Sequence, residues 1–241
     1  MATQDFFVLL PPSEGKSAGG HERSSWDTHS GLFGDALGDY RAEVSDRLAA
    51  LKGGDARLLG VKGAHLARAQ ESNRALPGSP TLPAWQRYTG VVWDHLDLAS
   101  MTAAQRKSAT TRLFVPSGLL GMVRADDPIP DYRLKMGARL APFGVMAKWW
   151  RDDLTEAFAA VVKKRVVIDV LPNEHRAAFD FSLVTSVRHV DLVSRTGGIV
   201  GGHNAKAAKG LLIRHLLLTK GTSIERMVAS FEHPEYRAVI T

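Results

Sequence analysis

One short segment near the N-terminus constrains the fold more than any other part of the sequence. Residues Phe6–Leu10 read FFVLL and are all apolar, and Pro11 and Pro12 end the run. A continuous apolar run bounded by prolines predicts a buried strand whose carboxyl end opens into a loop. The chain beyond it is rich in Gly, Ser and His as far as about Gly34, and a connection of this length predicts a loop that lines a cleft.

Helices and strands alternate along the rest of the chain. Apolar spacing predicts helices over residues 35–51, 56–59, 64–69, 103–111, 145–161, 204–218 and 223–231, and strands over 112–116, 165–170 and part of 181–193. The alternation predicts an α/β fold of mixed α+β character. With 241 residues, 44% of them hydrophobic, the chain suits one large domain or two small lobes that share a core. The Pro- and Gly-containing stretch 76–83 is the first candidate for an internal boundary.

The charge of the chain favours polyanionic partners. The formal net charge is +6, and Lys and Arg concentrate in two segments, with nine against three Asp over 101–151 and six against one Asp over 186–220. Such clusters suit a phosphate backbone, although a solvated basic face without a partner is about equally consistent with composition alone. Few aromatic residues interleave with the cations, which argues against a stacking platform for single strands.

Several chemistries are excluded by what the sequence lacks. There is no cysteine, so disulfides, thiolate metal sites and thiol redox chemistry are ruled out. The nine histidines form no H-x-x-x-H or H-E-x-x-H pattern, no G-x-S-x-G elbow occurs, and we expect neither a metal nor a cofactor. Residues 1–5 carry no basic leader and no apolar stretch is long enough to cross a membrane, so cytoplasmic residence without a membrane partner is expected.

Two glycine-containing segments resemble nucleotide-binding motifs without satisfying them. Gly15-Lys16-Ser17 matches the end of the P-loop pattern G-x-x-x-x-G-K-[ST], but Leu10 occupies the position of the first glycine. Lys16 could still pair with a phosphate as a point charge. The glycine-rich segment 197–202 lacks the Rossmann spacing and predicts an ordinary hairpin or loop.

The segment 56–69 approximates a helix-hairpin-helix motif. In that motif a glycine-bounded turn presents backbone N–H groups at a helix N-terminus to one DNA phosphate, without reading the base sequence. The residues that would meet the DNA backbone here are Gly60, Lys62 and Gly63. Two residues separate the glycines where one apolar residue is usual, so an ordinary helical corner is at least as consistent with the sequence.

Four ordered blocks of sequence resemble the YaaA or DUF328 (UPF0246) family of peroxide-stress proteins. The blocks are Pro12-Ser13-Glu14-Gly15-Lys16, Tyr88-Thr89-Gly90, Ser117-Gly118-Leu119-Leu120-Gly121 with Tyr132-Arg133-Leu134-Lys135-Met136, and Asn204-Ala205-Lys206 with Lys209-Gly210. A further block, 168–175, is similar to a strand-to-loop segment of the family. It departs from the family pattern at Pro172 and His175, where Ser and Tyr are common, which puts any role assigned to those two positions in doubt.

The resemblance implies a single domain over residues 1–241 with a cantaloupe-like fold, a positively charged cleft and a helix-hairpin-helix element at about 56–71. It further implies survival of hydrogen peroxide, limitation of iron-linked damage, and binding of DNA, double-stranded DNA included. Because the chain has no cysteine and no haem or metal motif, non-specific binding and shielding of duplex DNA is the simpler mechanism.

A second hypothesis makes the same cleft an enzyme site for a nucleotide-like or other anionic small molecule. Polar residues of the blocks fall at expected strand ends, loops and helix starts, where α/β proteins assemble sites. The candidate binding residues are Ser13, Lys16, Tyr88, Ser117, Arg133, Lys135, Asn204, Lys206 and Lys209, and the candidate catalytic residues are Glu14, Lys16, Tyr132 and Glu174. Either carboxyl could serve as acid or base if burial raised its pKa. A third interpretation, a structural salt-bridge network, is about as consistent with these residues as catalysis.

Overall fold

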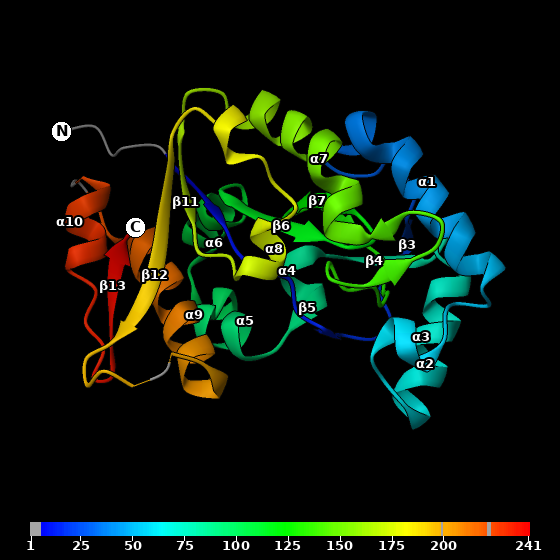
Figure 1. Cartoon of the computed structure of the whole chain (residues 1–241), viewed down its shortest axis with the longest axis horizontal. Helices are drawn as coiled ribbons and strands as arrows, with labels where there is room; N and C mark the ends of the chain where they lie inside the picture. Colours follow the sequence, from blue (N-terminus) through cyan, green and yellow to red (C-terminus); the bar gives the residue numbers. More distant parts are fainter. Residues whose placement is uncertain (1–5, 199, 221–222) are drawn as a thin grey trace.

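The computed structural model is built around a six-stranded sheet with strand order β13-β12-β11-β1-β6-β7 (Figure 1). The strands are β1 (Phe6–Leu9), β6 (Leu113–Ser117), β7 (Gly121–Arg124), β11 (Val166–Asp169), β12 (Val187–Ser194) and β13 (Tyr236–Ile240). The structure describes residues 6–198, 200–220 and 223–241. The expectation for a leader at residues 1–5, and the part of the expected glycine-rich loop at Ile199, therefore lie outside the described residues.

The apolar run near the N-terminus forms the centre of this sheet, as predicted. All four residues of β1 are buried, and β1 pairs in parallel with β11 on one side and with β6 on the other. Leu9, the last residue of β1, lies opposite Asp169, the last residue of β11, and opposite Phe114, beyond which β6 continues to Ser117. The chain therefore leaves all three strands at one edge of the sheet.

Helices cover the sheet and close its core. In Figure 1 α1 (Gly34–Ala50) and α7 (Met146–Val162) lie above the sheet, and α5 (Val91–Leu96) and α9 (Gly202–Leu218) lie below it. Phe114 on β6 makes edge-to-face contacts with Phe7, Phe33 and Phe158, with ring centroids 4.9, 5.9 and 5.5 Å apart. These aromatic contacts join β1, α7 and the N-terminus of α1 in one core.

The other helices are short. They are α2 (Ala56–Leu59), α3 (Gly63–Arg74), α4 (Ala84–Arg87), α6 (Ala103–Thr110), α8 (Asn173–Arg176) and α10 (Ile224–Ala229), with 3₁₀ turns at Leu98–Ser100 and Phe181–Leu183. The start of α6 is fixed by a capping box, in which Thr102 and Gln105 each bond the backbone N–H of the other. None of the helices in the described part of the chain combines the length and the hydropathy needed to cross a bilayer.

The predicted long loop after β1 contains two strands that the sequence did not indicate. They are β2 (Gly15–Lys16), paired with β5 (Tyr88–Thr89), and β3 (His21–Ser25), paired with β4 (Pro80–Pro83). β4 also pairs with β8 (Pro128–Ile129), and β9 (Arg139–Leu140) pairs with β10 (Gly144–Val145). These strands lack apolar alternation, and only their distant partners reveal them.

The stretch 76–83 is therefore not a linker, because β4 joins strands from either side of it in the sequence. Helix α3 also runs to Arg74, beyond the predicted residue 69. Its last turn is held by Asn73, which is fully buried and donates from Nδ2 to the carbonyl oxygens of Gly53 and Arg133. The remaining predicted helices and strands agree with the structure to within two residues at most ends, which confirms the mixed α/β class.

Candidate functional site

The segments that follow β1, β8 and β11 line one cavity. The chain leaves β1 toward β6 on one side and later returns to β11 on the other, and ligand sites of α/β sheets form at the carboxyl ends of strands at such a switch point. The cavity, here called the strand-end pocket, has a volume of about 60 Å³. It is lined by Pro12, Ser13, Glu14, Lys16, Tyr132, Arg133, Leu134, Lys135, Met136, Glu174 and His175.

Glu14 is an ionised carboxylate held between two cations. Its Oε2 lies 2.7 Å from Nη2 of Arg133, and its Oε1 lies 2.7 Å from Nζ of Lys135. Burial favours the protonated form, but Lys135 and Arg133 together outweigh it, so the pKa of Glu14 lies below its ordinary value. The raised pKa that a general acid would need is therefore not found at Glu14.

Lys16 has a different environment from the other cations of the pocket. Its Nζ donates to the carbonyl oxygen of Ser13 at 2.9 Å and lies 4.1 Å from the ring centroid of Tyr132 and 5.4 Å from that of Tyr88. Among the described residues no carboxylate comes within ion-pair distance of this amine. Burial is the largest influence and lowers the pKa of Lys16 to about 7.

Behind the pocket, three hydroxyl groups form a buried chain. The Tyr132 hydroxyl lies 2.8 Å from the Tyr88 hydroxyl and 2.7 Å from Oγ of Ser117, which in turn accepts the backbone N–H of Leu120. Burial raises the pKa of Tyr132 to about 12 and that of Tyr88 well above its ordinary value, so both phenols stay neutral. Their hydroxyls bond to one another, and Tyr132 presents its ring face to Lys16.

Arg133 joins the pocket to α2. Its Nε donates to the carbonyl oxygen of Leu59 at 2.9 Å, and its Nη atoms bond the carbonyl and carboxylate oxygens of Glu14. Arg68 on α3 makes a second link, since it donates to the carbonyl oxygen of Lys16 at 2.9 Å and pairs with Asp131 at 2.8 Å. The loop after β1 is thus fixed against α2 and α3.

Helix α8 contributes the far wall of the pocket. Oε1 of Glu174 accepts the backbone N–H of Gly137 at 3.1 Å. Nδ1 of His175 is buried and has no hydrogen-bond partner among the described residues. Burial lowers the pKa of His175 to about 4, so the imidazole is neutral at physiological pH and one buried nitrogen is unsatisfied.

The predicted residues of α9 do not line the pocket. The Nζ of Lys209 donates to the carbonyl oxygen of Val170 at 2.5 Å, and burial lowers the pKa of Lys209. Asn204 is exposed and lies 3.4 Å from the carboxylate of Glu235, and Lys206 is exposed. The structure therefore separates these three residues from the nine predicted residues that cluster at or behind the pocket: Ser13, Glu14, Lys16, Tyr88, Ser117, Tyr132, Arg133, Lys135 and Glu174.

The residues predicted to contact DNA occupy the turn between α2 and α3, here called the α2–α3 turn (residues 60–63). Gly60 ends α2 with φ of +64°, and Gly63 starts α3 with φ of +57°, values that favour glycine. Lys62 is exposed, and no side chain caps the N-terminus of α3. A Cβ atom at Gly60 would lie 3.3 Å from Nζ of Lys135, so the turn borders the strand-end pocket.

Two contributions were not predicted from the sequence. The unsatisfied nitrogen of His175 depends on burial, although the residue follows the candidate Glu174 directly. Asp131, the partner of Arg68, adjoins the candidate Tyr132, and this adjacency was the only available signal. Within the described residues no group of three or more His, Asp or Glu side chains is arranged to hold a metal ion.

Comparisons with known proteins identify the family of this chain. The family described as "Peroxide stress protein YaaA" matches residues 6–239. A UPF0246 protein of Streptomyces coelicolor is 35% identical over 227 residues, which cover 90% of this chain and 85% of the relative, and one of Corynebacterium glutamicum is 34% identical over 218 residues, covering 88% and 85%. A UPF0246 protein of Francisella tularensis is 31% identical over 137 residues, covering 54% and 52%. The chain therefore belongs to the YaaA (UPF0246) family of peroxide stress proteins.

Proposed function

We propose that this chain acts in the cytoplasm during peroxide stress by binding duplex DNA without sequence preference, thereby limiting iron-linked oxidative damage to the DNA. The observation that supports this proposal is the exposed α2–α3 turn. Nothing lies within 4 Å of the space where a Cβ atom of Gly63 would stand, so a phosphate could approach the backbone there. Lys62 directly precedes Gly63 and Arg57 lies on α2; both are exposed, with no carboxylate partner among the residues described.

The neighbouring cations extend the same basic surface. Arg133 and Lys135 lie beside the α2–α3 turn, and each shares the single carboxylate of Glu14. Phosphate contacts of this kind position a protein on duplex DNA without reading bases. Glu14→Gln should therefore leave duplex binding intact or make it slightly stronger.

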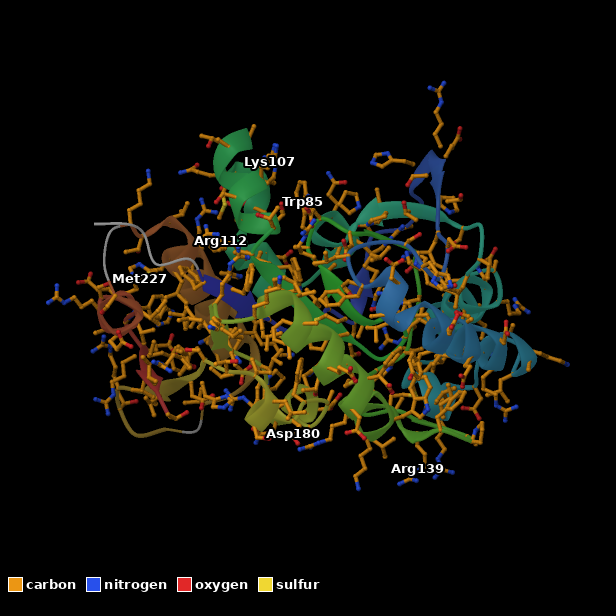
Figure 2. All side chains as sticks on the ribbon, turned by 90° about the horizontal axis from the view of Figure 1, so that it is seen from above. Trp85, Lys107, Arg112, Arg139, Asp180 and Met227 are labelled. Carbon is orange, nitrogen blue, oxygen red and sulfur yellow. The ribbon has the colours of Figure 1, made fainter. Side chains whose placement is uncertain are left out.

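Fluorescence anisotropy with a labelled duplex tests the proposal. We expect the logarithm of the binding constant to fall with the logarithm of salt concentration by about 0.9 per neutralised phosphate. Lys62→Glu should weaken binding several-fold, whereas Lys107→Glu, the same charge change on exposed α6 away from the turn (Figure 2), should weaken it much less. Undetectable binding, or equal loss in both variants, would contradict the proposal.

The strand-end pocket supports a second candidate function, the conversion of a small anionic or nucleotide-like molecule. The specific observation is that Lys16 and His175, one without a carboxylate partner and one with an unsatisfied nitrogen, line the same cavity at the switch point of the sheet. Its volume of about 60 Å³ corresponds to a few water molecules, so only the anionic end of a nucleotide could enter.

Nuclear magnetic resonance tests this candidate through the backbone amide of Gly137, which bonds Glu174 at the pocket wall. Titration with inorganic phosphate and with glycolate should shift this amide saturably, and Lys135→Met should weaken the response while Lys107→Met leaves it unchanged. Unchanged spectra with both anions would argue that the charges serve the structure alone.

A further inference from the structure

Lys16 stands apart from the other charged groups at the strand-end pocket. Both oxygens of Glu14 are engaged by Arg133 and Lys135, and the carboxylate of Asp131 is engaged by Arg68. The amine of Lys16 has instead one carbonyl oxygen and two aromatic ring faces around it. A cation placed to neutralise carboxylates would be expected to contact one.

The groups around Lys16 act on its proton in opposite directions. Burial opposes the charged form most strongly, Asp131 and Glu14 favour it, and Arg133 and Arg87 oppose it. The neutral phenols of Tyr88 and Tyr132 supply no countercharge, although their ring faces attract a cation weakly. The pKa of about 7 means that a large fraction of the amine carries a free electron pair at neutral pH.

The cavity beside Lys16 provides the other requirements of a reactive site. The Lys135 side chain is 36% exposed and its ammonium uses one donor on Glu14, which leaves further donors for a carboxylate of a ligand. His175 lines the same cavity, and its Nδ1 is buried without a hydrogen-bond partner among the described residues. If the Lys16 amine only held the loop in place, it would need neither an adjacent cavity nor a neighbouring residue with an unsatisfied polar atom.

We propose that Lys16 is a nucleophilic amine that condenses with a small α-oxo acid bound in the strand-end pocket. The inference rests on the second candidate function and names its substrate class. The carbonyl group is the electrophile, and its neighbouring carboxylate pairs with Lys135. The small volume of the pocket favours the shortest members of the class.

The step balances without any co-reactant. The amine nitrogen of Lys16 attacks the carbonyl carbon, the carbonyl π pair moves to oxygen, and a proton passes from nitrogen to that oxygen to give a carbinolamine. Loss of the hydroxyl with the second amine proton forms the C=N bond. One neutral amine and one carbonyl compound thus give one imine and one water molecule.

Reductive trapping of the full-length chain with glyoxylate and sodium cyanoborohydride tests the inference. Peptide mass mapping should find carboxymethylation concentrated at Lys16, with the exposed Lys62 and Lys107 as internal references. The initial rate should rise about ten-fold from pH 6 to pH 8, as expected for an amine with a pKa of about 7. Lys16→Arg should abolish the fast labelling, and Lys107→Arg should leave it unchanged.

Two outcomes would overturn the inference, and glycolate separates them. Glycolate has the carboxylate but no carbonyl, so it reports binding alone through the Gly137 amide. If glycolate binds while labelling is no faster at Lys16 than at the reference lysines, the amine chemistry is wrong and the pocket remains a ligand site. If glycolate does not bind and Lys16 is not labelled selectively, both the inference and the second candidate function fail.

Discussion

Two buried ionisable side chains lie in the region where neighbouring parallel strands end, and they differ in how many partners surround them. Asp169 ends β11 and is fully buried, and Lys16 follows β1. Asp169 accepts from Nε of Arg176 at 2.7 Å, from Nδ1 of His189 at 2.7 Å and from the backbone N–H of Leu171 at 2.8 Å. Both carboxylate oxygens of Asp169 are thus engaged by donors.

The comparison separates a structural charge from a chemical one. Arg176 also pairs with Asp191 at 3.0 Å, so the aspartate belongs to a network that ties β11, β12 and α8 together. Lys16 belongs to no such network and borders a cavity. A satisfied group stabilises its fold, whereas an amine deprived of a countercharge is available for binding or reaction.

The largest expected effect comes from removing the hydrogen-bonded carboxylate of Asp169. Asp169→Ala should lower the free energy of unfolding by about 3–5 kcal/mol, because Arg176 and His189 would lose their shared buried carboxylate. Urea denaturation measures the change. Asp39→Ala, which removes an exposed carboxylate from α1, should stay within about 0.5 kcal/mol, and equal effects of the two variants would refute the distinction.

The second effect tests the unsatisfied imidazole. Because the pKa of His175 is about 4 in the folded chain and 6.5 ordinarily, the unfolded chain binds the proton first, and stability is lost as pH falls from about 6.5 toward 4. We expect a loss on the order of 2 kcal/mol across this window, and His175→Gln should remove that part of the acid sensitivity. If the wild-type chain and His175→Gln lost stability identically as the pH falls, His175 would be solvated or hydrogen-bonded in the folded chain.

A smaller effect tests which charges act on the pKa of Lys16. Asp131 favours the protonated amine, so Asp131→Asn should lower the pKa of Lys16 and move the pH profile of glyoxylate labelling down by about one unit or less. Asp126→Asn, at a carboxylate paired with Arg124, is the matched control and should not move it. A shift to higher pH would contradict the assignment of charges around Lys16.

The smallest effect is on stability at pH 7. Lys16→Met keeps a long side chain against Tyr132 and removes a buried amine, so the free energy of unfolding at pH 7 should change by less than about 1 kcal/mol. From pH 7 to pH 10 the unfolded chain holds the lysine proton that the folded chain releases. The wild-type chain should therefore gain stability relative to Lys16→Met as pH rises through this range, and the opposite slope would show a paired ammonium.

Sequence reasoning reached the central strand because its signal is local. The run Phe6–Leu10 and the polar residues after it predict both a buried strand and a site at its end. The sequence predicted that Ser117, Tyr88 and Tyr132 belong to one polar site. It did not predict that their hydroxyls form one chain, because the three residues come from separate segments of the sequence. β2 and β5, two residues each, have no periodicity to detect.

Burial and pairing set the limits of prediction from the sequence. Glu14 and Lys16 were both candidate catalytic residues, but the partners that Glu14 has and Lys16 lacks are Arg133 and Lys135, more than a hundred residues away. Lys209 matches a family block yet bonds the carbonyl oxygen of Val170 outside the cavity. Residue type and spacing could propose these groups, whereas only their contacts distinguish a satisfied charge from an unsatisfied one.

The most direct test of the account is the titration of Lys16 itself. The chemical shift of its ε-carbon, assigned by comparison with Lys16→Arg, can be followed by nuclear magnetic resonance from pH 5 to pH 11 in the folded chain. The structure predicts a midpoint at about 7. A midpoint near the ordinary lysine value of 10.5 would show a solvated or paired ammonium and would contradict the account.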